Sequence, residues 1–173
     1  MMSVRGERSF APGTQWWILA ALFAATVVPR IALFLLGRLW DPALSSSNII
    51  YGDAIGYHAR ALTVFGPSGF YVPNAAIDFI RPPLFPIFVA LIYLVGGLVP
   101  WHVLIAQAVV AGMTCVVLYE AAKDAISPRA AILMGLAFAL DPPLILASNL
   151  LLSEVLFLLF CALEDSPSLT SSE

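Results

Sequence analysis

The stretch that decides the fold is WWILAALFAATVVPRIALFLL, residues 16–36, which carries a single charge, Arg30. A helix of this length spans about 30 Å, the thickness of a hydrocarbon core. Trp16, Trp17 and Trp40 lie where aromatic side chains anchor a helix at the membrane interface. Small residues near position 24 would suit cleavage of a signal peptide, but the hydrophobic run continues beyond them. We therefore predict a retained membrane-spanning helix.

The composition of the whole chain agrees with a bilayer environment. Of the 173 residues, 61% are hydrophobic and only 11% are charged, with a mean hydropathy of +0.93. A soluble domain carries roughly 25% charged residues and still exposes about a third of its surface to water. These values exclude a cytosolic enzyme, a nucleic-acid-binding protein and a disordered protein. The net charge of −3 includes no polybasic cluster.

The cysteines and histidines predict no metal or disulfide site. Cys115 and Cys161 both lie within apolar runs, which is typical of small core or lipid-facing residues rather than of a disulfide. His58 and His102 are far apart along the chain, so we interpret both as surface histidines rather than metal ligands.

The first half of the chain contains a tail and a long loop around the first span. Residues 1–15 are predicted to be a cytoplasmic tail, and residues 41–82 are predicted to be an outer loop with short interfacial helices. Within this loop, residues 53–65 have helical spacing, and we expect Asp53 to be the N-cap. One side of this helix carries an apolar stripe, formed by Ile55, Ala59 and Leu62.

Residues 83–99 and 103–122 form the next two apolar segments. The first has about 17 residues, opens with prolines and is marginal as a span, so we predict a re-entrant or surface helix on the outer side. The second is long enough to be a span. Lys123 and Arg129 flank the turn after it, and the positive-inside rule therefore places this turn in the cytoplasm.

Residues 130–163 are too short for two crossings. As a helix they would span about 51 Å, whereas two crossings need about 60 Å and a turn. We predict one crossing, a break at Asp141-Pro142-Pro143, and a new helix near Glu154 that ends inside the membrane. Residues 164–173 are serine-rich and predicted to be disordered. The expected fold is therefore an all-α integral membrane module over 16–163, with about four transmembrane helices, the last incomplete.

Charged residues in so apolar a chain need an explanation, and each has two interpretations. Asp53 is either a water-exposed helix cap or a general base or cation ligand at the membrane surface. Glu154 either caps a helix or faces a polar cavity. Arg30 either extends to the interface or binds a phosphate through paired hydrogen bonds. Asp141, before two prolines, is typical of a turn or cap residue.

The order of several short motifs resembles a known family. These motifs are D-x-x-x-Y-x-x-x-A at 53–61, Gly66, RPPLFP at 81–86, YEAAK at 119–123, RAA at 129–131 and LLLSE at 150–154. The chain is similar over about residues 14–163 to the N-terminal part of integral-membrane glycosyltransferases of the GT-C superfamily. Within it, the protein O-mannosyltransferases and the bacterial aminoarabinose–lipid A transferases (glycosyltransferase family 39 and its kin) are the most similar branch.

The resemblance implies transfer of a sugar from a polyprenyl-phosphate-linked donor to an acceptor outside an inner or plasma membrane. The acceptor would be a lipid, a glycan or a protein. The resemblance assigns Asp53 as the general base and Glu154 as the second catalytic acid, which positions the acceptor or a metal. It does not decide whether the enzyme uses a divalent metal as cofactor.

The resemblance also implies a set of substrate-binding residues. Tyr57 and His58 lie beside Asp53, and Pro83 belongs to the proline-rich stretch 82–86 that would shape the wall of the donor site. Arg81 or Arg30 would contact the carrier phosphate.

Members of this family have several hundred residues and more spans, so we expect this sequence to be a fragment of such an enzyme. The alternative is a non-catalytic small membrane protein, such as a lipid-binding protein, a carrier or an assembly subunit. An enzyme requires Asp53 and Glu154 on the same side of the membrane, whereas a packing protein does not.

Overall fold

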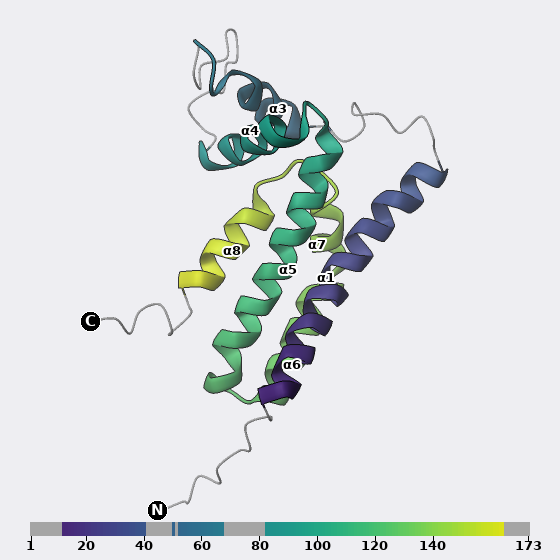
Figure 1. Cartoon of the computed structure of the whole chain (residues 1–173), viewed down its shortest axis with the longest axis vertical. Helices are drawn as coiled ribbons and strands as arrows, with labels where there is room; N and C mark the ends of the chain where they lie inside the picture. The colour runs from purple at the N-terminus through teal and green to yellow at the C-terminus, as the bar shows by residue number, and fades with distance from the viewer. Residues whose placement is uncertain (1–11, 41–49, 51, 68–81, 165–173) are drawn as a thin grey trace, which may run out of the picture.

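The computed structural model describes residues 12–40, 50, 52–67 and 82–164, and every regular element in these ranges is an α-helix (Figure 1). In chain order these helices are α1 (Pro12–Trp40), α3 (Asp53–Thr63), α4 (Leu84–Gly96), α5 (Pro100–Ala125), α6 (Pro128–Leu140), α7 (Pro142–Ala147) and α8 (Glu154–Glu164). The all-helical prediction is confirmed for this part of the chain. Most of both predicted tails lies outside the described residues.

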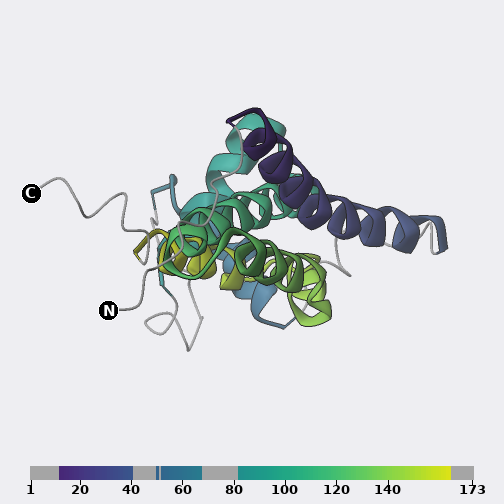
Figure 2. The same ribbon diagram turned by 90° about the horizontal axis from the view of Figure 1, so that it is seen from below.

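Helix α5 is the central element, and α1, α6 and α8 pack along it (Figures 1 and 2). The start of α1 and the turn between α5 and α6 lie at one end of this bundle, while α3 and α4 lie across the other end (Figure 1). The predicted cytoplasmic tail and the predicted cytoplasmic turn are therefore attached to the same end. We call this the basic end, and the end with α3 and α4 the outer end.

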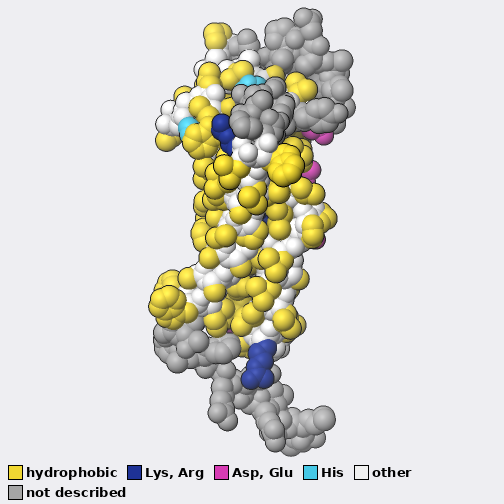
Figure 3. Space-filling view, turned by 90° about the vertical axis from the view of Figure 1, so that its right-hand side faces the viewer, with side chains coloured by type: hydrophobic (Ala, Val, Ile, Leu, Met, Phe, Trp, Pro, Cys, Tyr) yellow, Lys and Arg dark blue, Asp and Glu magenta, His cyan; other side chains and the backbone are white. Residues whose placement is uncertain are grey.

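Two helices are long and apolar enough to cross a membrane: Gln15–Trp40 and Pro100–Ala125, each of 26 residues. Helix α6 has 13 residues and α8 has 11. Figure 3 shows a largely hydrophobic surface along the bundle, with the charged side chains of this face near its two ends. Large exposed apolar residues occur on all the long elements, among them Leu36, Val109, Leu133 and Phe157.

Helix α4 does not run along the bundle but crosses its outer end, packed beside α3 and against the start of α5 (Figure 1). Its apolar sequence is predicted to form a surface or re-entrant helix, and the structure shows that it lies across the bundle axis and not along it. It ends at Gly96 and is followed by the C-cap Gly97, whose φ of 78° lies in the left-handed region that favours glycine. Pro100 then starts α5.

The predicted break within residues 130–163 is confirmed at Asp141, which ends α6 and precedes α7. Pro142 and Pro143 have no N–H group, so the carbonyls of Phe138 and Ala139 lose their helical donors. A new helix begins at Glu154, also as predicted. The two prolines thus end α6 after 13 residues.

Of the two interpretations of Arg30, extension to the membrane interface is contradicted by the structure, because the side chain is 2% exposed. The Nη1 atom donates hydrogen bonds to the carbonyls of Thr26 at 2.7 Å and Ala139 at 3.0 Å. The Nε atom donates to Ser148 Oγ at 3.1 Å. Arg30 therefore satisfies a carbonyl that the double proline leaves without a partner, and a cation at the end of α6 also complements the helix dipole.

The predicted cap of α3 is also corrected. The N-cap is Gly52, with φ of 58°, and Asp53 is the first helical residue. The face of α3 that packs inward is formed by Ala54, Tyr57 and Ala61, whereas Ile55 and Leu62 of the apolar stripe are 57% and 48% exposed. Ile55 and Leu62 therefore lie on the surface of the protein and not in the contact with α4.

Close packing of α1, α5 and α6 forms the core of the bundle. Leu22, Cys115, Tyr119, Ala131 and Ala139 are buried together there. Cys115 Sγ donates to a carbonyl of α6 at 3.3 Å, and both cysteines are free, as predicted.

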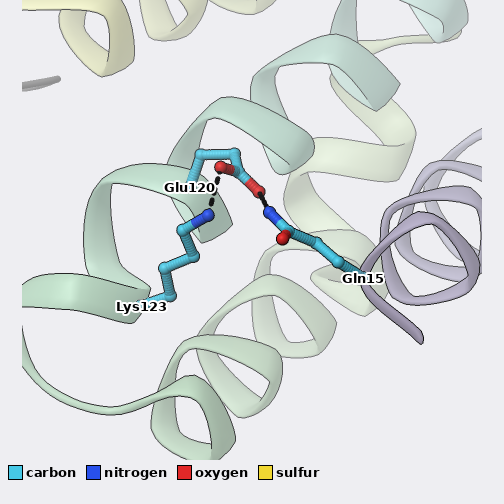
Figure 4. Close-up of polar contacts among 3 residues, drawn as sticks. All are labelled: Gln15, Glu120 and Lys123. Atoms are coloured by element: carbon cyan, nitrogen blue, oxygen red, sulfur yellow. Dashed lines mark hydrogen bonds and ion pairs between the residues drawn. The ribbon is translucent and has the colours of Figure 1, made fainter. Parts of the chain in front are cut away.

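A polar contact joins α1 to α5 at the basic end (Figure 4). Glu120 accepts a hydrogen bond from Gln15 Nε2 at 3.2 Å and from Lys123 Nζ at 2.6 Å. The carboxylate thus bridges the two long helices. An ion pair as exposed as this one contributes little stability, so the apolar core carries most of the energy.

Gly112 of α5 packs against Phe23 and Val27 of α1, and its replacement by alanine should destabilise the bundle. An added Cβ would lie 2.7 Å from the ring of Phe23 and 2.9 Å from Val27. Relieving such a clash costs about 1–3 kcal/mol. Thermal unfolding in detergent measures this loss of stability.

The control is Ala137→Val, at an exposed position of α6. This change should alter the stability by less than about 0.5 kcal/mol. Equal melting of both variants would contradict the expectation.

Candidate functional site

Two distant segments meet at the outer end through a hydrogen bond between Tyr57 and Ser153. The Tyr57 hydroxyl lies 3.2 Å from Ser153 Oγ, across 96 positions of the chain. The Tyr57 ring is 7% exposed and meets the ring of Phe85 edge-on at 4.9 Å. This contact fixes α3 relative to the start of α8.

The two predicted catalytic acids lie on the segments that this bond joins. Asp53 precedes Tyr57 by four residues, one helical turn, and therefore lies on the same side of α3. Glu154 follows Ser153 directly and begins α8. Both are exposed and both lie at the outer end. The carboxylates are therefore on one side of the bundle, and each lies in the first turn of its helix, where the dipole stabilises negative charge.

His58 pairs with Tyr93 of α4. Its Nδ1 atom lies 2.8 Å from the Tyr93 hydroxyl, and the two rings meet edge-on. Burial lowers the pKa of His58 and raises the pKa of Tyr93 to about 12. Tyr93 therefore remains a hydroxyl, which can donate to the neutral imidazole of His58. The pair holds α3 against α4.

The lowered pKa of His58 should make the stability of the protein depend on pH. A histidine whose pKa is lower in the folded state binds fewer protons there, so the free energy of unfolding falls as pH drops below the unfolded value of about 6.5. The loss stops growing once folded His58 is itself protonated. Melting curves at pH near 7.5 and 5.5 measure this loss. It should shrink in His58→Gln and persist in His102→Gln; an unchanged loss in His58→Gln would contradict it.

Gln107 is a site residue that sequence reasoning missed. Its side chain is completely buried in α5, and Nε2 donates to the carbonyls of Leu150 at 3.1 Å and Leu152 at 3.2 Å. These carbonyls lie in the irregular segment just before Ser153 and Glu154, so Gln107 holds that segment in place. The sequence feature that could have identified Gln107 is a single amide side chain within an apolar helix.

The other predicted substrate-binding residues have different positions. Pro83 is exposed at the N-terminus of α4, and its carbonyl accepts from Ile87 N at 3.2 Å. It thus lies at the outer end with Tyr57 and His58. Arg30 is buried among α1, α6 and α7 and is not part of this group. Arg81 lies outside the described residues.

Metal coordination finds no support in the described ranges. No three His, Cys, Asp or Glu side chains within them are close enough to hold an ion. The ring of His102 packs on Trp101, with ring centroids 4.0 Å apart. An added Cβ on Gly96 would lie 2.7 Å from His102 Nδ1. His102 is therefore a packing residue at the junction of α4 and α5.

Comparisons with known proteins identify no relative of this chain. No protein-family model matches it, and neither does any curated protein or any solved structure. The function must therefore be inferred from the residues and their geometry.

Proposed function

We propose that the chain is part of a membrane glycosyltransferase that transfers a sugar from a polyprenyl-phosphate-linked donor to an acceptor on the outer face of the membrane. The observation that carries this proposal is the Tyr57–Ser153 hydrogen bond, which brings the helix of Asp53 to the helix of Glu154. The resemblance of the motifs at 53–61 and 150–154 to the GT-C glycosyltransferases supplies the reaction type.

In the proposed reaction, Asp53 is the general base. Its carboxylate accepts the proton of an acceptor hydroxyl, whose oxygen bonds to the anomeric carbon of the sugar. The bond between that carbon and the phosphate oxygen breaks, and the lipid phosphate leaves with the electron pair. Glu154 orients the acceptor. The wall beside them includes Tyr57, His58 and Pro83, and Arg81 is the proposed contact of the carrier phosphate.

The proposed topology has about four transmembrane helices in an inner or plasma membrane, with the outer end facing outward. Helices α1 and α5 are the two spans that length and hydropathy support. Helices α6 and α7 together would form a third, and α8 would be the incomplete last one. Lys123 and Arg129 lie at the basic end and favour its cytoplasmic placement.

A transfer assay in proteoliposomes tests the proposal. The full-length protein that contains this chain is reconstituted and given polyprenyl-phosphate donors that carry radiolabelled sugars, with membrane lipids, glycans or peptides as acceptors. We expect label to appear in one acceptor class and free polyprenyl phosphate to be released in equal amount. Failure with every donor would overturn the proposal and favour the non-catalytic membrane protein.

A further inference from the structure

A groove of about 530 Å³ opens between the outer ends of α1 and α5. It is lined by Phe34, Leu35, Arg38, Leu39 and Trp101. Arg38 is the one basic residue in the last turn of α1, and the rest of this lining is apolar or aromatic. The volume lies within the range of about 300–1,000 Å³ typical of small-ligand sites.

The groove exists because α1 diverges from α5 toward the outer end, as both ribbon views show (Figures 1 and 2). Deeper in the same seam, Phe34 also lines a much smaller cavity of about 10 Å³ beside Arg30. The helices are thus in close contact below the groove and separate above it. In a bilayer, lipid chains would fill the apolar part of this space in preference to water.

With α1 as a membrane span, Arg38 would lie near its end, where lipid phosphates are found. It is two residues from Trp40, the end of the apolar span, and Trp101 lies at the corresponding start of α5. Its side chain is exposed, and no hydrogen bond or ion pair joins it to the described part of the chain. A guanidinium in this position can bind a phosphate through two parallel hydrogen bonds.

We propose that this groove binds one anionic glycerophospholipid of the bilayer, with an acyl chain along Phe34, Leu35 and Leu39 and its phosphate on Arg38. The positive charge of Arg38 and the apolar walls complement the two parts of such a lipid. Trp101 borders the headgroup at the interface. The bound lipid fills the space between the diverging helices. The site depends on membrane insertion of α1 and α5 but not on sugar transfer.

Photocrosslinking tests this site in the full chain, reconstituted into phosphatidylcholine nanodiscs without any sugar donor. Each sample contains a trace of either phosphatidylglycerol or phosphatidylcholine with a photoreactive acyl chain, and mass spectrometry maps the labelled peptides. We expect label near residues 34–39 and 101, with phosphatidylglycerol preferred about fivefold because of Arg38. Arg38→Gln should reduce this preference to about one, whereas Arg129→Gln, exposed at the basic end, should keep it.

Three results would overturn the proposal. The first is equal labelling of the groove by both lipids in the unmodified protein, and the second is a preference that survives Arg38→Gln. The third is displacement of the label by polyprenyl phosphate at concentrations where unlabelled phosphatidylglycerol has no effect, which would make the groove a site for the carrier lipid. The experiment measures lipid labelling and not sugar transfer. A negative result in the transfer assay therefore leaves the proposed lipid site standing, and a negative labelling result leaves the proposed function standing.

Discussion

If Asp53 is the general base of the proposed sugar transfer, we expect its replacement with asparagine to lower the transfer rate by about 10²–10⁴-fold, the usual contribution of a positioned general base. An amide has nearly the same shape as a carboxylate but cannot accept the proton of the acceptor hydroxyl. Asp53 is exposed in the first turn of α3, and the fold does not depend on burial of its side chain. The loss should therefore appear in kcat, with the melting temperature almost unchanged.

The matched control is Asp124→Asn, which removes an exposed carboxylate at the basic end of the bundle. It should leave transfer at the unmodified rate. Glu154→Gln should also reduce transfer, and by less than Asp53→Asn, because its proposed role is to orient the acceptor. If the Asp53→Asn protein transfers sugar at the unmodified rate, Asp53 is not the base and the assignment is wrong.

Replacing Arg30 with alanine destabilises the protein by about 3–5 kcal/mol, the largest stability effect that we expect. The change removes a long, completely buried side chain and leaves a cavity between α1 and α6. It also removes the donor to the carbonyl of Ala139, which Pro143 cannot supply. A buried carbonyl without a partner alone costs about 1–3 kcal/mol.

Arg30→Lys should recover only part of this loss. A lysine retains the charge but lacks the planar fork with which Arg30 reaches α1, α6 and Ser148 together. Equilibrium unfolding in mixed detergent micelles measures each variant. Arg129→Ala, on the exposed side of α6, should stay within about 0.5 kcal/mol of the unmodified protein.

A double-mutant cycle of Arg30→Ala and Ser148→Ala separates the energy of the Arg30–Ser148 hydrogen bond from the other effects of removing the Arg30 side chain. The Nε–Oγ bond between α1 and the end of α7 should give a positive coupling energy of about 0.5–3 kcal/mol. Strict additivity of Arg30→Ala and Ser148→Ala, or an alanine variant as stable as the unmodified protein, would show that Arg30 does not tie these helices together.

The elements that the sequence predicted well are those that local chemistry determines. The break at Asp141 follows from two consecutive residues without an N–H group, and the start of α8 follows from an acidic residue at the head of an apolar run. The assignment of α1 and α5 as helices long and apolar enough to cross a membrane follows from their length and hydropathy. None of these predictions needs a partner distant in the chain.

The contacts that build the candidate site could not be predicted in this way. Tyr57 and Ser153 are separated by 96 positions, and His58 and Tyr93 by 35. Many other residues of the chain could form a hydrogen bond of the same type with each of these side chains. Only the packing of α3 and α4 across the outer end decides which one does. Gln107 similarly gained its role only because the segment 150–152 passes beside it.

Arg30 shows the same division most clearly. By itself, the sequence determined an apolar helical chain, two helices long enough to cross a bilayer and a helix interrupted by two prolines, because hydrophobicity and backbone donors are properties of each residue. Only the tertiary structure decided that Arg30 lies inside the bundle rather than at the interface, and that the segments of Asp53 and Glu154 meet. Pro143 leaves the carbonyl of Ala139 without a helical donor, but only the packing of α1 against α6 brings Arg30 to it.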